Sequence, residues 1–278
     1  MFRKNYYYLV AGLKEYALDA EAKGFDIQSI VAEIKENLSS RDRRSAELLY
    51  GYYDIENIIN IRAGRNRFSI LGNFSREELE AELVSPVRLP AFIADTVKAY
   101  DLAAGGNDPS ADNFDSGVSL EHALFAAWYD ACAHDKSRFL RQWAVFDKTL
   151  RNVSAAFTAR RLNVPVADVI VGSGDIESAL MRSSAADFGI RGELSWMDQL
   201  VAAMSDNSNI VEKEKRIDSI RWNMADELSA MNYFDIDFIL AYLVKVNLIS
   251  RWTSLDAARG RELLHKLIDG LTAVPAIP

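Results

Sequence analysis

A glycine-containing turn near position 173 comes closer to a chemical motif than any other part of the sequence. Residues 169 to 177 read Val-Ile-Val-Gly-Ser-Gly-Asp-Ile-Glu: an apolar segment, a turn at Gly172-Ser173-Gly174 and a helix start. Backbone N–H groups in such a turn can hold a phosphate. A Walker loop, however, needs Lys and then Ser or Thr after its last Gly, and a dinucleotide fingerprint needs a third Gly in place of Glu177. Asp175 and Glu177 would also repel phosphate, so the pattern favours an Asp-capped helix after a tight turn.

Two other sets of residues resemble metal ligands only in part. Asp108, Ser110 and Asp112 alternate like the start of an EF-hand loop, but Asn113 and Ser119 stand where calcium binding needs Gly and Glu. We therefore expect a solvated acidic loop. The histidines lack metal-ligand spacing, and we expect core or surface positions for all of them: His122, His134 and His265.

The sequence offers no convincing nucleophile. The single cysteine, Cys132, lies between Ala131 and Ala133 in a helical run, which is typical of a small buried hydrophobe. There is no Gly-x-Ser-x-Gly motif, and no local spacing isolates two carboxylates for acid–base chemistry. We predict no catalytic residue, no cofactor and no metal.

Composition narrows the protein class. The chain has 278 residues, 49% of them hydrophobic, with only 6 Pro and 14 Gly, which favours a mostly helical globular protein. A net charge of −8 argues against nucleic acid or anionic lipid as the main partner and favours a protein with basic surfaces. No long apolar run predicts a membrane span, and the N-terminus does not resemble a signal peptide.

Local signals predict helices along most of the chain. Residues 5–10 are aromatic and β-prone, so they predict a short strand or an extended tail. Asp26 predicts a helix cap, and Ser75 with Glu78 has the spacing of a capping box. After a brief apolar segment at 166–171, helical patterns continue to the C-terminal tail. The predicted helices cover about 26–40, 42–64, 75–83, 91–104, 175–181, 195–204, 210–231, 235–251 and 254–271.

The central span from Ser119 to Asn163 contains neither Gly nor Pro. One helix of that length would extend about 66 Å, longer than a compact domain, and a break at His134-Asp135 is predicted. A heptad seam follows the break: Phe139, Trp143, Phe146, Leu150, Val153 and Phe157. The predicted organisation is an N-terminal helical lobe (1–104), an acidic loop (105–118), and a long central helix with a C-terminal helical lobe (119–278), with one continuous domain as the alternative.

Two surface groups have simple interpretations. The cluster Tyr6, Tyr7 and Tyr8 fits buried edge packing better than an exposed docking site. Solvent exposure is expected for the basic residues Arg41, Arg43, Arg44, Arg160 and Arg161.

Two similar helical segments lie near opposite ends of the chain. Residues 53–62 and 239–251 each carry an Asn before an apolar pair, at Asn57 and Asn247, and then an Arg, at Arg62 and Arg251. These segments resemble the C subunit of V-type ATPases, whose eukaryotic counterpart is the d subunit. Almost the full length also resembles an uncharacterised bacterial family encoded beside V-type ATPase genes, through the blocks at 5–13, 53–57, 72–79, 186–189, 215–218 and 251–256.

The resemblance implies an all-α, lobed architecture like that of the V-type ATPase C subunit, with one long central helix. It implies a non-catalytic central-stalk component that couples the rotor axle to the membrane proteolipid ring in proton or sodium transport. The implied partners are the axle subunits and that ring. The implied location is cytoplasmic, peripheral on the cytoplasmic face of the inner membrane.

Two other functions remain open. One is a nucleotide-binding enzyme or hydrolase that uses the turn at Gly172-Ser173-Gly174, and the other is a helical adaptor unrelated to the ATPase. For Arg62 and Arg251 we favour a structural role, through the helix dipole or internal carboxylates, over a role in partner binding.

Overall fold

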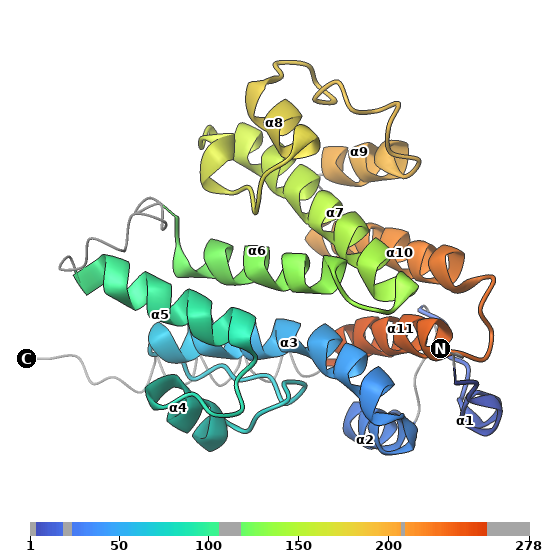
Figure 1. Cartoon of the computed structure of the whole chain (residues 1–278). Helices are drawn as coiled ribbons and strands as arrows, with labels where there is room; N and C mark the ends of the chain where they lie inside the picture. Colours follow the sequence, from blue (N-terminus) through green and yellow to red (C-terminus); the bar gives the residue numbers. More distant parts are fainter. Residues whose placement is uncertain (1–3, 19–23, 106–117, 207–208, 255–278) are drawn as a thin grey trace, which may run out of the picture.

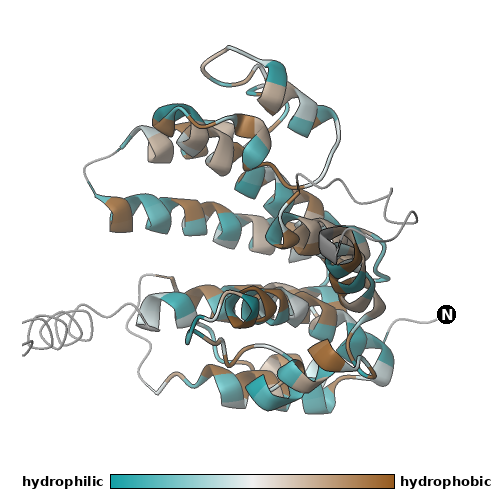
Figure 2. Cartoon of the chain, turned by 90° about the vertical axis from the view of Figure 1, so that its left-hand side faces the viewer, coloured by the Kyte–Doolittle hydropathy of each residue, from teal (hydrophilic) through white to brown (hydrophobic). Residues whose placement is uncertain are grey.

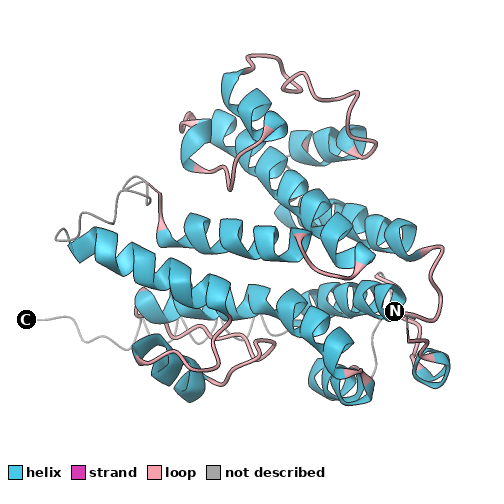
Figure 3. Ribbon diagram, viewed as in Figure 1, coloured by secondary structure: helices cyan, strands magenta, loops and turns pink. Residues whose placement is uncertain are grey.

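The structure is a computed structural model that describes residues 4–18, 24–105, 118–206 and 209–254. All regular structure in these ranges is helical, as predicted (Figure 3). None of the described helices is long and apolar enough to cross a bilayer. The helices are α1 (Tyr7–Gly12), α2 (Ile27–Asn37), α3 (Ser40–Arg62), α4 (Arg76–Val84), α5 (Ala91–Gly105), α6 (Leu120–Ala133), α7 (Arg138–Leu162), the 3-10 turn η2 (Val166–Asp168), α8 (Asp175–Arg182), α9 (Met197–Ser205), α10 (Ile210–Ser229) and α11 (Ile236–Ser254).

Side-chain caps fix several helix starts where the sequence predicts them. Asp26 accepts hydrogen bonds from the backbone N–H groups of Gln28 and Ser29 at the start of α2. Ser75 and Glu78 form the predicted capping box of α4. Each cap satisfies N–H groups that the helix itself leaves unpaired, so these boundaries are set locally. Ser254, where a last helix is predicted to begin, is instead the final residue of α11. The rest of that predicted helix (255–271) and the residues Asp108, Ser110, Asp112 and His265 lie outside the described residues.

Two predicted elements are wrong. Residues 7–12 form helix α1 rather than a strand or tail, because Tyr6 is anchored from outside: its N–H donates to the carbonyl of Phe234. The single long central helix is also wrong, because two helices, α6 and α7, take its place. They are separated at His134-Asp135, where the sequence predicts a break. Asp135 accepts from the N–H of Ser137, and the Ser137 hydroxyl accepts from the N–H of Leu140, which starts α7 afresh.

The helices pack as two groups of three, which we call the first triad (α3, α5, α6) and the second triad (α7, α10, α11). In the first, α6 packs against both α3 and α5, and in the second all three helices pack against one another. The connected helices α6 and α7 pack together and join the triads (Figure 1). Similar segments at the two ends of the chain thus occupy α3 and α11, one in each triad. The division into lobes at 105–118 stays a prediction.

The predicted seam of α7 forms much of the core. Phe139, Trp143, Phe146, Leu150 and Val153 are all buried, and Phe157 packs edge-on against Phe188. Figure 2 shows hydrophobic and hydrophilic residues alternating along the helices, as expected for helices with one buried face. The seam buries one face of α7 in the middle of the molecule, where Trp143 lines the same cleft as Asp147 and Asp218.

Candidate functional site

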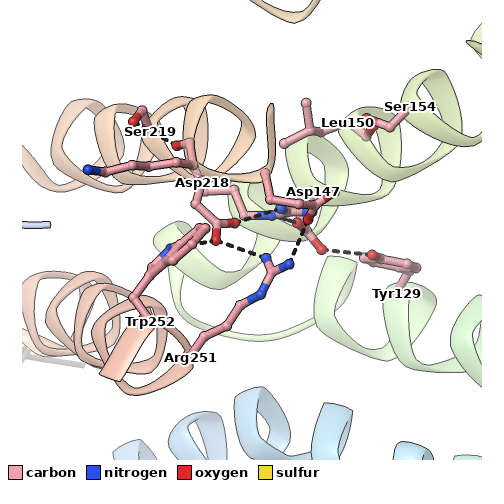
Figure 4. Close-up of polar contacts among 11 residues, drawn as sticks. Tyr129, Asp147, Leu150, Ser154, Asp218, Ser219, Arg251 and Trp252 are labelled. Carbon is pink, nitrogen blue, oxygen red and sulfur yellow. Dashed lines mark hydrogen bonds and ion pairs between the residues drawn. The ribbon is translucent and has the colours of Figure 1, made fainter. Parts of the chain in front are cut away.

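A chain of ion pairs connects three helices in the middle of the structure. Arg221 of α10 donates from Nε to Asp147 of α7 over 3.0 Å, and from Nη1 to Asp218 over 3.0 Å. Arg251 of α11 donates to the other Asp218 oxygen over 2.8 Å and to Glu214 over 2.6 Å. Asp218 is completely buried. Figure 4 shows Arg251 and Trp252 reaching toward Asp218 from α11.

Two neutral side chains complete this ion-pair network. The indole N–H of Trp252 donates to Asp218 over 3.0 Å, and the hydroxyl of Tyr129 on α6 donates to Asp147 over 2.8 Å (Figure 4). Burial raises the pKa of Tyr129, and the carboxylate of Asp147 adds to that rise, so the phenol stays neutral. Burial alone would lower the pKa of Arg221, but Asp147 and Asp218 outweigh it and raise that pKa. Both carboxylates are therefore held in place by charge-assisted hydrogen bonds from arginines.

A cleft of about 740 Å³ lies beside this network, between the first and second triads. We call it the interlobe cleft. Its walls come from α3, the segment after α3, α6, α7, α10 and α11, and they include Tyr52, Tyr53, Glu56, Arg67, Trp128, Trp143 and the network residues. A second hollow of about 280 Å³ shares Tyr52, Glu56, Arg67, Asp147 and Arg221 with it and continues toward Arg65 and Arg151. The two form one elongated depression.

Three polar groups of α3 line the cleft without partners. Within the described part of the chain, neither the hydroxyl of Tyr52, the hydroxyl of Tyr53 nor the carboxylate of Glu56 makes a hydrogen bond or ion pair, although all three residues are partly buried. Their spacing places them on adjoining faces of one helix. Burial raises the pKa of Tyr52 to about 12 and raises that of Tyr53 further. Both phenols are thus neutral hydrogen-bonding groups.

Glu56 is the unusual member of this set. Burial raises the pKa of its carboxyl group, and Arg67, Arg151 and Arg251 oppose that rise from a distance. A partly buried carboxylate without a partner is unfavourable, since desolvation is not offset by a hydrogen bond or a close cation. The interlobe cleft can therefore offer a carboxylate, two phenols and aromatic walls to something that enters it.

The turn at Gly172-Ser173-Gly174 is filled by the chain's own carboxylate. Glu177 is almost completely buried, and its Oε1 lies 3.1 Å from Nζ of Lys148 and accepts a hydrogen bond from Asn152. A Cβ on Gly174 would lie 2.7 Å from the other Glu177 oxygen. The predicted Asp cap is wrong: Gly174 itself is the N-cap residue and Asp175 lies in the first turn. An internal anion thus sits where a phosphate would have to bind.

The remaining sequence candidates are spread over the molecule. Cys132 is buried, as predicted, and burial raises its thiol pKa well above the ordinary value. His134 is exposed and contacts the Asp130 carbonyl over 2.8 Å, while His122 is partly buried. The described residues contain no cluster of His, Cys, Asp and Glu that could hold a metal ion.

The tyrosine cluster is divided by the fold. Tyr6 is buried and its hydroxyl donates to Asp42 over 2.5 Å, as edge packing predicts, whereas Tyr8 is 97% exposed and Tyr7 is 55% exposed. Tyr7 lies against Phe234, with ring centroids 4.8 Å apart. The prediction of burial is therefore right for Tyr6 and wrong for the other two.

The predicted solvent-facing arginines behave differently from one another. Arg43 and Arg44 are exposed, and Arg43 donates to the carbonyls of Lys35 and Glu36 at the end of α2. Arg161 is exposed and Arg41 is partly buried. Arg160 instead covers the Phe188 ring, 3.5 Å from its centroid, and donates to the carbonyls of Ala185 and Ser183. Arg160 is thus a packing residue, which corrects the prediction.

Both arginines of the repeated segments bind internal carboxylates, as the structural interpretation predicts. Arg62 makes a two-pronged ion pair with Asp101 of α5, at 2.9 and 2.8 Å. Arg251 binds Asp218 and Glu214 of α10. In each triad, an Arg near the end of one helix thus holds an Asp of another helix.

Sequence reasoning missed the interlobe cleft and its network. Asp147, Asp218 and Arg251 are far apart in the sequence, and each looks like an ordinary surface charge on an amphipathic helix. The one available signal was the block 215–218, where Asp218 follows Ile217 on the buried stripe of α10. A charged residue at a core position predicts a buried partner.

Comparisons with known proteins give a family and no function. The family model described as "Protein of unknown function (DUF2764)" matches residues 3–273, nearly the whole chain. Neither a curated protein nor a solved structure matches the chain. The chain therefore belongs to the DUF2764 family of proteins of unknown function.

Proposed function

We propose that this chain is a non-catalytic coupling component of the central stalk of a V-type ATPase, with a role like that of the C subunit. In this role it sits on the cytoplasmic face of the inner membrane and seats the rotor axle on the proteolipid ring. Proton or sodium transport belongs to the ring, and ATP hydrolysis belongs to the headpiece. The proposal concerns mechanical coupling only.

The observation that carries the proposal is the placement of the two similar segments in the two triads. The related segments in α3 and α11 lie one in each triad, and in each triad an Arg binds an Asp on another helix. The C subunit of V-type ATPases is built from related helical lobes, and a division of this chain into such lobes is part of the proposal. The resemblance itself rests on the sequence blocks described above.

The ion-pair network supports a mechanical role. A coupling piece must pass torque between its contacts without its helices sliding past one another. Asp147, Asp218 and Glu214 are joined through Arg221 and Arg251, so that α7, α10 and α11 are connected by directional contacts in the interior. Such networks fix the relative positions of helices more narrowly than apolar contact alone.

The occupied glycine turn weakens the nucleotide-binding alternative. Glu177, Lys148 and Asn152 satisfy one another at the turn, and a phosphate would have to displace a buried carboxylate. This arrangement favours a role without nucleotide chemistry.

Gene deletion tests the proposed function. In the deletion strain, ATP-driven ion pumping by membrane vesicles should fall, while hydrolysis by the detached headpiece should continue because its nucleotide sites belong to other subunits. Pumping should return when the gene is supplied from a plasmid. A membrane ATPase that remains fully assembled and coupled in the deletion strain would overturn the proposal.

A further inference from the structure

We propose that the interlobe cleft binds an arginine or lysine side chain of a protein partner, with Glu56 as its counter-ion and Tyr52 and Tyr53 as hydrogen-bonding neighbours. This inference rests on the proposed function and names the chemistry of one partner contact. It follows from the groups in the cleft that the chain leaves unsatisfied.

Glu56 is the carboxylate of the cleft that an incoming cation could bind, and Arg67 is the cation of the same wall that is unpaired within the described residues. The other carboxylates of the cleft already have cations: Asp147 and Asp218 bind Arg221, Glu214 binds Arg251, and Glu121 lies 3.3 Å from Arg151. Glu56 alone among these has no hydrogen bond or ion pair within the described residues. A cation brought by a partner would offset its desolvation and gain a charge-assisted hydrogen bond.

The aromatic wall suits the same kind of group. The ring of Tyr52 lies 5.1 Å from Phe125 and 5.5 Å from Trp128, centroid to centroid, and Arg151 already lies over Phe125, 4.1 Å from its centroid, so this aromatic cluster accommodates a guanidinium group. Cations bind favourably over such faces, and a guanidinium group also stacks on them. The two phenol oxygens can accept its remaining N–H donors.

The charge of the chain and the shape of the depression favour a protein segment over a small cation. A net charge of −8 attracts basic segments over a distance. The cavities of about 740 and 280 Å³ share a wall and extend toward the exposed rim residues Arg65 and Arg67. These two arginines make no ion pair with the described part of the chain, and they would meet acidic residues flanking the bound cation.

A pair of peptides that differ in the charge of one side chain tests the proposal. The probe is acetyl-Gly-Leu-Arg-Leu-Gly-amide, and its control carries citrulline, which is uncharged and nearly isosteric, in place of arginine. Binding is measured by calorimetry and by intrinsic tryptophan fluorescence, to which Trp128 and Trp143 of the cleft contribute. We expect saturable binding of the arginine peptide, at least tenfold tighter than that of the citrulline peptide.

Variants locate the binding. Glu56→Gln should weaken arginine-peptide binding at least tenfold, and Tyr52→Phe should weaken it by a smaller factor without removing the ring. Glu121→Gln is the matched control, because its carboxylate lies at the same depression but is paired with Arg151. Circular dichroism verifies that each variant is folded. Equal affinities for the two peptides, undiminished binding by Glu56→Gln, or no saturable binding below about 10 mM would each overturn the inference.

The same variant separates this inference from the proposed function. If deletion of the gene uncouples the ATPase but Glu56→Gln restores full coupling and assembly, the function stands and the role of Glu56 is wrong. If deletion leaves the ATPase coupled while the peptide results hold, the cleft binds basic segments but the partner is a different protein.

Discussion

The hydroxyl of Tyr50 donates a hydrogen bond to Oδ1 of Asn247, 2.9 Å away, across 197 positions of the chain. Tyr50 is completely buried on α3 and Asn247 lies on α11, so the bond joins the two helices that carry the repeated segments. Asn57, the counterpart of Asn247, instead exchanges two hydrogen bonds with the backbone of Ser69. The two asparagines therefore make different contacts although their sequence contexts are alike: Asn247 bonds another helix, and Asn57 bonds the loop that follows its own helix.

The two repeated arginines should differ in their contribution to stability. Arg62 and Asp101 are both well exposed, with side-chain exposures of 37% and 48%, so Arg62→Ala should cost less than about 1 kcal/mol. Arg251 binds Asp218, whose side chain is 0% exposed, so Arg251→Ala should cost about 1.5 to 3 kcal/mol. Urea unfolding followed by circular dichroism gives both values. Equal losses would show that burial of Asp218 does not set the strength of its ion pairs.

The aromatic seam of α7 should be a major source of stability. Trp143 is 5% exposed and stacks on Phe139, with centroids 5.8 Å apart. Trp143→Ala should lower the free energy of unfolding by about 3 to 5 kcal/mol, because it leaves a cavity in the core. Val145→Ala, at a 59% exposed position of the same helix, is the control and should change little. A Trp143→Ala melting temperature within a degree or two of wild type would show that the seam is not tightly packed.

Asp54 should make stability depend on pH. Burial raises its pKa from 3.8 to about 6, although hydrogen bonds from Asn73 and Phe74 lower it. The native state therefore holds this proton more tightly than the unfolded state, and the contribution is present below about pH 4 and is lost as pH rises to about 6. The loss is at most roughly 3 kcal/mol.

The Asp54→Asn variant isolates that effect. Its stability should gain on that of wild type as pH rises from about 4 to about 6, and the difference should then level off. Urea titrations of both proteins at each pH measure it, and other titrating groups cancel in the comparison. A difference that is constant with pH, or that changes in the opposite direction, would contradict the shifted pKa of Asp54.

Gly174 should not tolerate a side chain. Its φ is 156°, and an added Cβ would lie 2.7 Å from Oε2 of Glu177, which leaves an alanine no room beside the buried carboxylate. Gly174→Ala should cost about 1 to 3 kcal/mol. Gly192→Ala is the control, because a Cβ there would meet nothing within 4 Å. Thermal unfolding compares them, and a neutral Gly174→Ala would mean that the Glu177 carboxylate moves aside easily.

The parts of the fold predicted correctly are those that neighbouring residues determine. The capping box of Ser75 and Glu78 and the Asp26 cap depend on residues within three positions, and the seam of α7 depends on periodicity alone. Helix α1 was missed because tyrosines favour strands locally, whereas its start is fixed by the bond from Tyr6 to Phe234, which is remote in sequence.

The candidate site could not be predicted for the same reason. Tyr52, Tyr53 and Glu56 read as an ordinary helix surface, and only the packing of α3 beside the second triad turns that surface into a wall of the interlobe cleft. A charged side chain is unpaired only if none of the helices around it brings an opposite charge close to it. The spacing of residues within one helix carries no information about those neighbours.

The bond between Tyr50 and Asn247 has a consequence for synthesis of the protein on the ribosome. At about 5 to 20 residues per second, the 197 positions between them take roughly 10 to 40 s to translate. During that interval the phenol of Tyr50 lacks this partner and remains open to other contacts, even though α6, which packs on α3, has already been made. The native environment of Tyr50 is therefore completed only after α11 has been made, late in the synthesis of the chain.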